Sequence, residues 1–280
     1  MDEHFRAFSF VDRIHSIQPG VGIRGSYAIP SVIASFPVSL VAEAVGQLAA
    51  WAAMAALDFK WRPVAGLAGN IELLSPVRPG QVLELAADLE TVDTEAVAYG
   101  GTAQVGETPV IRLQHCVGPM MPLEEFDDPR ALRERSAVLQ GAGAMPGVFG
   151  GVPSFALDRT GGEAGQSLCA MLHVPTIAPF FADHFPRRPV FPGTLLMNAN
   201  LELAAALAAQ WPPPAAGGRW VLRGMSDVKL RAFTPPGEIL EIEARLNQLS
   251  TDSATVSVAT RQGKRVISGA CVRLTLEECS

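Results

Sequence analysis

Two side chains in this sequence combine residue type and setting in a way that suits proton-transfer chemistry. His184 lies in a proline-rich stretch, residues 183–193, and a histidine titrates near neutral pH. Glu43 lies inside the apolar segment 38–57, where desolvation is expected to raise the pKa of its carboxyl group. Together they could act as a general base and a general acid. The alternatives are a structural histidine and a core glutamate, although an unpaired buried carboxylate is costly.

The composition narrows the class of protein. The chain has 280 residues, of which 48% are hydrophobic and only 18% are charged, which excludes overall disorder and coiled coil. This length suggests about two domains of ~140 residues. The formal net charge of -6 gives no general basic field, so we expect no nucleic-acid binding and no binding to anionic membranes.

The segment 38–57 is nearly all apolar and is long enough to span a bilayer. However, Glu43 and Gln47 interrupt it, no basic residue flanks its N-terminal side, and its many alanines suit close packing. We therefore predict a buried helix and no membrane span. The acidic start of the chain lacks the features of a signal peptide, which predicts a cytoplasmic protein.

An internal repeat indicates how the chain is organised. Residues 191–205 (FPGTLLMNANLELAA) match residues 36–50 (FPVSLVAEAVGQLAA) at an offset of 155 positions. The Pro-Gly turn at 236–237 follows the one at 79–80 at an offset of 157. Matching anchors in one order indicate a duplicated module.

Each copy contains one helix whose apolar surface must be buried. An antiparallel sheet wrapped around the helix would bury it. We predict an N-terminal module over 1–120, a charged and glycine-rich linker over 121–150, and a C-terminal module over 151–280. Two such modules can pair edge to edge as a pseudo-dimer within one chain, and further homo-oligomers are compatible with this arrangement.

The string HFPRRPVFPG at 184–193, followed by an apolar helix, resembles the signature of the β-hydroxyacyl-acyl-carrier-protein dehydratases. Residues 8–20 resemble the opening strand of that family, and residues 77–85 and 234–242 resemble a later strand pair. The resemblance implies an α+β fold, a tandem (double) hotdog, with an antiparallel sheet wrapped around a long central helix in each half.

In this family the histidine acts with a carboxylate fourteen residues further on, which the partner subunit's helix contributes. That position here is Asn198, which has no carboxylate, whereas Glu43 stands at the equivalent position of the first half. Ile29 stands where the first half would need its histidine. The resemblance therefore implies one composite catalytic site, His184 with Glu43, and one inactive pair, Ile29 with Asn198.

Further site residues follow from the same resemblance. The backbone N–H of Gly193, at the start of a helix, is the expected oxyanion contact. Ser39 is expected to border the same site, and Gln47 could orient Glu43 or simply fill the core. Glu202 is a rival carboxylate that we assign to the inactive pair. No metal ligands are predicted.

The activity implied is that of a lyase: the dehydration of 3-hydroxyacyl thioesters to trans-2-enoyl thioesters in fatty-acid or polyketide-type synthesis. The substrate would be carried on the phosphopantetheine of an acyl carrier protein or of CoA, with no other cofactor. The alternatives are a hotdog thioesterase, an enoyl isomerase, or a non-catalytic module that binds acyl carriers.

Arg187 departs from the family pattern, which usually has glycine after HFP. A basic rim for an acidic carrier or a cofactor phosphate is one interpretation, and ordinary solvated charges are the other. The rim would comprise Arg187, Arg188, Arg223, Lys229 and Arg231.

Overall fold

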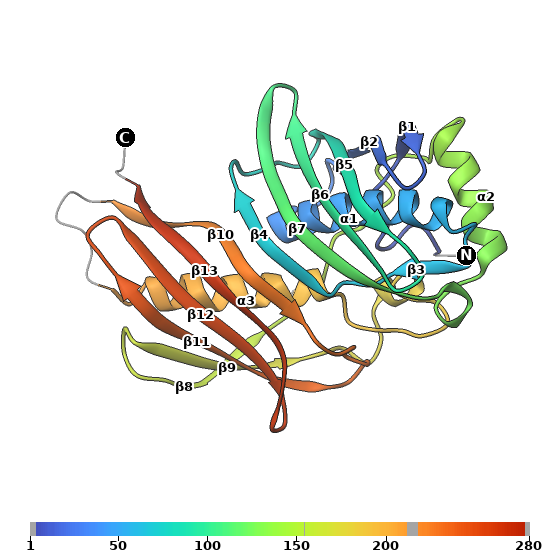
Figure 1. The fold of residues 1–280 in the computed structure, drawn as a ribbon. Helices are drawn as coiled ribbons and strands as arrows, with labels where there is room; N and C mark the ends of the chain where they lie inside the picture. Colours follow the sequence, from blue (N-terminus) through green and yellow to red (C-terminus); the bar gives the residue numbers. More distant parts are fainter. Residues whose placement is uncertain (1–3, 154, 212–217, 278–280) are drawn as a thin grey trace.

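The structure is a computed structural model that describes residues 4–153, 155–211 and 218–277. Its strands form one antiparallel sheet in the order β1-β2-β5-β6-β7-β4-β10-β13-β12-β11-β9-β8, and the short β3 pairs with β7. Figure 1 shows this sheet as two curved parts side by side, one blue to green and one yellow to red. The prediction of an antiparallel sheet with long apolar helices is confirmed.

The part of the sheet that comes first in the sequence surrounds helix α1 (Val38–Ala56). Its strands are β1 (Arg13–Gln18), β2 (Gly22–Ala28), β3 (Trp61–Pro63), β4 (Leu67–Leu73), β5 (Val82–Val92), β6 (Ala96–Val105) and β7 (Thr108–Pro122). The helix packs mainly against β5, β2 and β6. By length and composition α1 could cross a membrane, but 67% of its most apolar stretch is buried, so it is the core helix of this part.

The second part surrounds helix α3 (Gly193–Ala208), which packs against β9, β10, β11 and β12. Its strands are β8 (Leu157–Gly161), β9 (Ser167–His173), β10 (Arg219–Leu230), β11 (Ile239–Leu249), β12 (Ser253–Gln262) and β13 (Arg265–Glu277). The two long helices also contact each other. Figure 1 shows each of them lying against the strands of its own part.

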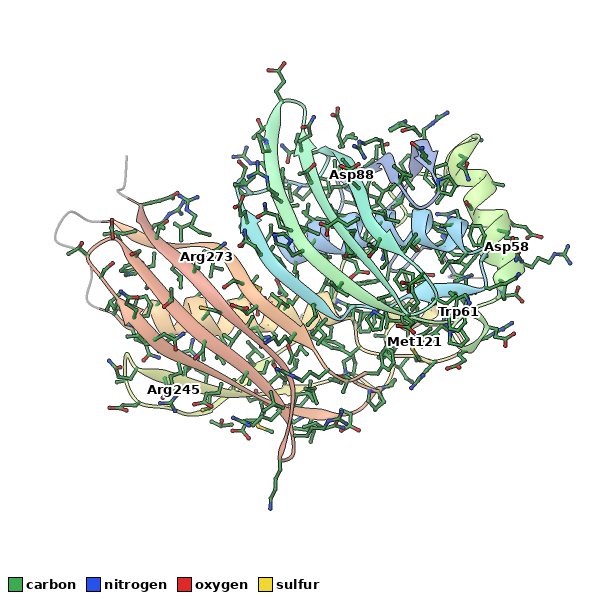
Figure 2. All side chains as sticks on the ribbon, in the orientation of Figure 1. Asp58, Trp61, Asp88, Met121, Arg245 and Arg273 are labelled. Atoms are coloured by element: carbon green, nitrogen blue, oxygen red, sulfur yellow. The ribbon has the colours of Figure 1, made fainter. Side chains whose placement is uncertain are left out.

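The two parts join where β4 pairs with β10. Asn70 lies opposite Ser226 in this antiparallel register, and Arg273 donates to the Asn70 side-chain oxygen at 2.7 Å. Arg273 is labelled in Figure 2 beside the joint. Hydrogen bonds of the backbone therefore run from one part of the sheet into the other.

The segment between the two parts contains regular structure. A 3-10 turn, η1 (Leu123–Glu125), follows β7, and α2 (Pro129–Gln140) packs against β1. Asp128 caps α2 by accepting from the backbone N–H groups of Arg130 and Ala131. A second 3-10 turn, η2 (Pro179–Ala182), precedes α3. The predicted linker, residues 121–150, thus includes a helix that covers the first part of the sheet.

A close approach between α1 and β6 depends on Gly101. A Cβ atom at this position would lie 2.5 Å from Val45 Cγ1 and 2.7 Å from the Ala86 carbonyl oxygen. We expect Gly101→Ala to lower the free energy of unfolding by about 1–3 kcal/mol, because the core must shift to accept the methyl group. Urea denaturation measures this loss.

The matched control is Gly161→Ala in β8, where a Cβ atom meets nothing within 4 Å. Its free energy of unfolding should change by no more than ~0.5 kcal/mol. Equal stability of the two variants would contradict the close packing of α1 on β6.

Candidate active site

A cavity of about 200 Å³ brings together the residues singled out in the sequence. Glu43 and Gln47 reach it from α1, His184 from the turn after η2, and Gly193 from the start of α3. Most of the remaining wall is apolar, and it includes Phe8, Ala50, Met54, Val64, Leu113, Met197 and Leu230. Two residues that are 141 positions apart in sequence, Glu43 and His184, therefore face one cavity.

The imidazole of His184 is held by the loop that carries it. Its Nδ1 lies 3.2 Å from the Val190 carbonyl oxygen. Because a carbonyl can only accept, Nδ1 carries the hydrogen and Nε2 keeps its lone pair. Burial lowers the pKa of His184 below its ordinary value of 6.5, and the negative charge of Glu43 opposes this effect only in part. A neutral imidazole with a free Nε2 can accept a proton.

Both oxygens of the Glu43 carboxylate are hydrogen-bonded. The Thr194 hydroxyl donates to Oε2 at 2.7 Å, and the Gln47 amide donates to Oε1 at 3.0 Å. Gln47 is fixed in turn, since its amide also donates to the Phe8 carbonyl at 2.9 Å and its oxygen accepts from the Phe10 N–H at 2.8 Å. The sequence left open whether Gln47 orients Glu43 or only fills the core, and the structure shows a hydrogen bond between the two side chains.

Ser39 lies outside this cavity in the described part of the chain, contrary to the expectation that it borders the site. It is buried, and its hydroxyl donates to the Asn198 side-chain oxygen at 3.3 Å. Asn198 in turn donates to Glu202 at 2.6 Å, and Ile29 is buried in the core. The sequence offset of 155 places Thr194 at the helix position of Ser39, so each hydroxyl crosses to the opposite helix.

The start of α3 borders the cavity at Gly193, directly after Pro192. The first N–H groups of an α-helix have no acceptor within the helix, and they form its positive end. A Cβ atom at Gly193 would lie 2.5 Å from Leu230 Cδ1, so the position suits glycine. This end of the helix can stabilise negative charge that develops on a bound oxygen.

Asp183 ties the N-terminal segment to the site. Its carboxylate accepts from the backbone N–H groups of Ala7 at 2.9 Å and Phe8 at 2.7 Å, and from that of Phe5. The ring of Phe8 then meets the His184 imidazole edge to face, with centroids 5.6 Å apart. The segment before β1 therefore forms a wall of the cavity.

Sequence reasoning missed two residues of this site. Thr194 could have been found, because the repeat offset pairs it with Ser39. Arg62 in β3 also lines the cavity, and it pairs with Met121 at the end of β7. Figure 2 labels Met121 and Trp61, the residue before Arg62. No spacing or pattern in the sequence indicated that Arg62 turns inward.

Three of the five basic residues proposed as a rim are engaged in ion pairs within the protein. Arg187 lies 3.1 Å from Asp128, and Arg188 lies 3.7 Å from Glu125. Arg223 pairs with a glutamate at the end of β13. These contacts favour paired surface charges over a free basic rim.

Comparisons with known proteins place this chain among acyl-thioester enzymes. The ApeI-like family, described as ApeI dehydratase, matches residues 161–270. The 3-hydroxyacyl-[acyl-carrier-protein] dehydratase FabZ of Rickettsia akari is 31% identical over 100 residues, which cover 34% of this chain and 69% of that protein.

Two solved structures share the fold over almost the whole chain. A protein described as an oleoyl thioesterase from Lactobacillus plantarum superposes with a TM-score of 0.60 at 9% identity, covering 91% of this chain and 96% of that one. An acyl-ACP thioesterase from Bacteroides thetaiotaomicron gives 0.52 at 12% identity, covering 91% and 98%. At these identities the likeness concerns the fold alone.

The lowered pKa of His184 can be measured directly by NMR titration of its imidazole. We expect protonation at a pH below 6.5, and a still lower pKa in Glu43→Gln, because that variant removes the negative charge that raises it. The unfolded chain takes up this proton near pH 6.5 and the folded chain only at lower pH. The contribution of His184 to stability is therefore lost as the pH falls below 6.5. A titration above pH 6.5 would contradict the buried, neutral imidazole.

Proposed function

Because this chain belongs to the family of hotdog-fold 3-hydroxyacyl-[acyl-carrier-protein] dehydratases, we propose that it removes water from 3-hydroxyacyl thioesters to give trans-2-enoyl thioesters. The observation that carries the proposal is the shared cavity of His184 and Glu43. The substrate would arrive on the phosphopantetheine arm of an acyl carrier protein or of CoA, in fatty-acid or polyketide-type synthesis. The side chains of the cavity supply the proton transfers.

We further propose that the chain is a double hotdog that supplies one composite site. The first half, residues 1–120, contributes Glu43, and the second half, residues 151–280, contributes His184 and Gly193. The pairing of β4 with β10 and the hydrogen bond from Thr194 to Glu43 support this pseudo-dimer. The Ile29 and Asn198 positions would form the inactive counterpart.

The proposed reaction divides the proton transfers between two residues. Nε2 of His184 takes the proton from the α-carbon of the thioester, and its electrons form the C=C bond. Negative charge that develops on the thioester oxygen is stabilised by the N–H of Gly193 at the positive end of α3. Glu43 must enter the reaction with its carboxyl group protonated, whereas the structure shows it as a carboxylate that accepts from Thr194 and Gln47. The 3-hydroxyl group leaves as water with this proton, and Glu43 becomes the carboxylate. Transfer of the α-proton from His184 to Glu43 then restores the protonated carboxyl group for the next turnover.

Thioester hydrolysis is a second candidate, because the two solved structures compared above are described as thioesterases. Hydrolysis would release a free thiol, whereas dehydration leaves the thioester intact and adds a conjugated double bond. A thiol reagent and the absorbance of the enoyl thioester therefore separate the two reactions in one assay.

The composite site can be tested with three substitutions. We expect His184→Ala and Glu43→Gln each to lower kcat/KM for a 3-hydroxyacyl thioester by about 10²-fold or more, because each removes a proton-transfer group. Asn198→Ala changes the equivalent position on the other helix and should retain activity within a few-fold. Equal activity in all three variants would contradict the composite site.

The hydrogen bond from Thr194 to Glu43 has a built-in control. Thr194→Val removes the donor and should lower kcat by about tenfold or more, because the hydrogen bond goes to a charged group. Thr194→Ser keeps a hydroxyl and should restore most of the activity. Ser39→Ala removes the equivalent hydroxyl, which contacts Asn198, and should leave kcat unchanged. A loss in Ser39→Ala as large as in Thr194→Val would refute the assignment.

A further inference from the structure

Arg62 places a positive charge on the wall of the cavity, with 13% of its side chain exposed, and the proposed reaction does not use it. Its guanidinium lies over the ring of Phe185, 3.9 Å from the centroid. The same ring stacks on the His184 imidazole, with centroids 4.2 Å apart. Arg62 is therefore a near neighbour of the proposed base.

Two of the three nitrogens of this guanidinium have no hydrogen-bond acceptor among the described residues. Nε and Nη1 are inaccessible to solvent, and neither has a hydrogen-bond partner among the described residues. Asp127 forms a long ion pair with Arg62, because its Oδ2 lies 3.9 Å from Nη1, but this separation is beyond hydrogen-bonding distance. Asp127 already accepts from the Asp128 N–H at 2.7 Å and lies 3.4 Å from His4.

An arginine in this environment lowers the stability of the folded protein. Burial lowers the pKa of Arg62 to about 10, although Asp127 and Glu43 oppose this effect, so the guanidinium stays charged at neutral pH. Buried charged donors without acceptors destabilise a folded protein. A bound molecule that brings an acceptor oxygen would satisfy them.

We propose that Arg62 binds an oxygen on the acyl chain of the substrate, so that the cavity selects 3-hydroxyacyl thioesters whose chain carries a further carboxylate or carbonyl group. This proposal rests on the proposed dehydration. The planar fork of a guanidinium matches a carboxylate with two parallel hydrogen bonds. The apolar walls around it would strengthen such a pair by excluding water.

The position of β3 favours the acyl chain over the carrier arm as the source of this oxygen. β3 packs against α1, and the cavity continues along α1 from Glu43 to Ala50 and Met54, about 16 Å at the rise of an α-helix. A thioester that places its α-carbon at His184 and its hydroxyl at Glu43 can extend its chain along this wall. Arg62 contributes to the same wall.

The test compares two substrates of equal chain length on the same short carrier. One is the N-acetylcysteamine thioester of 3-hydroxyoctanoic acid, and the other ends in a carboxylate instead of a methyl group. We expect the wild type to prefer the carboxylate substrate. Arg62→Met should raise KM for that substrate by about 10- to 100-fold and change the other less than about threefold, because only one substrate loses a charged hydrogen bond. Arg62→Lys should recover part of the loss.

Arg133→Met is the matched control. Arg133 also lies over a phenylalanine ring, that of Phe59 at 5.7 Å, and 3.8 Å from the carboxylate of Asp58, but it does not line the cavity. It should leave both KM values unchanged. An equal loss on both substrates in Arg62→Met would overturn the proposal, because Arg62 would then act on a group that the substrates share, such as the carrier arm or the reacting centre.

Two further measurements separate the role proposed for Arg62 from an effect on folding and from the proposed dehydration. Arg62→Met leaves the buried Asp127 without this ion-pair partner, so the thermal unfolding midpoint is measured first and the kinetics are compared at a temperature at which both proteins are folded. If the wild type dehydrates neither thioester, the proposed function fails. Calorimetry with the carboxylate thioester then still tests Arg62: tighter binding to the wild type supports the proposal, and equal binding to Arg62→Met overturns it.

Discussion

One hydrogen bond between the two long helices determines the geometry of the whole site. Thr194 is the second residue of α3, and its hydroxyl donates to the Glu43 carboxylate on α1 at 2.7 Å. The loop that carries His184 ends directly before α3. The hydrogen bond keeps Glu43 at the start of α3 and therefore close to His184. The pairing of β4 with β10 joins the two parts of the sheet, and the two helices contact each other. Neither half of the chain contains both side chains.

The proposed duplication would account for a second, similar contact between the two helices that has a different chemistry. Ser39 donates to Asn198 as Thr194 donates to Glu43, but an amide replaces the carboxylate and Ile29 replaces the histidine. A fused chain can change one of two equivalent sites without changing the other, whereas a homodimer changes both. The charge of Arg62 belongs to the first half and borders the cavity of Glu43.

The sequence predicted those features that depend on pattern and on spacing. The apolar segment 38–57 corresponds to α1, Val38–Ala56, and the repeat offset related Glu43 to Asn198. We expected Ser39 to border the cavity, but its hydroxyl donates to Asn198 instead. The spacing of residues along one helix does not show which side chain of a neighbouring helix a hydroxyl will contact. Arg62 was missed because its inward position depends on a three-residue strand that pairs with the distant end of β7. Such long-range pairing leaves no periodic signal in a short strand.

The most direct test of the composite site is a crystal structure of the protein with a non-hydrolysable amide analogue of a 3-hydroxyacyl thioester. We expect one analogue per chain, with its α-carbon next to Nε2 of His184, its hydroxyl on the Glu43 carboxylate and its carbonyl oxygen on the Gly193 N–H. An analogue bound at Asn198 and Ile29, or one whose hydroxyl and α-carbon face neither Glu43 nor His184, would contradict it.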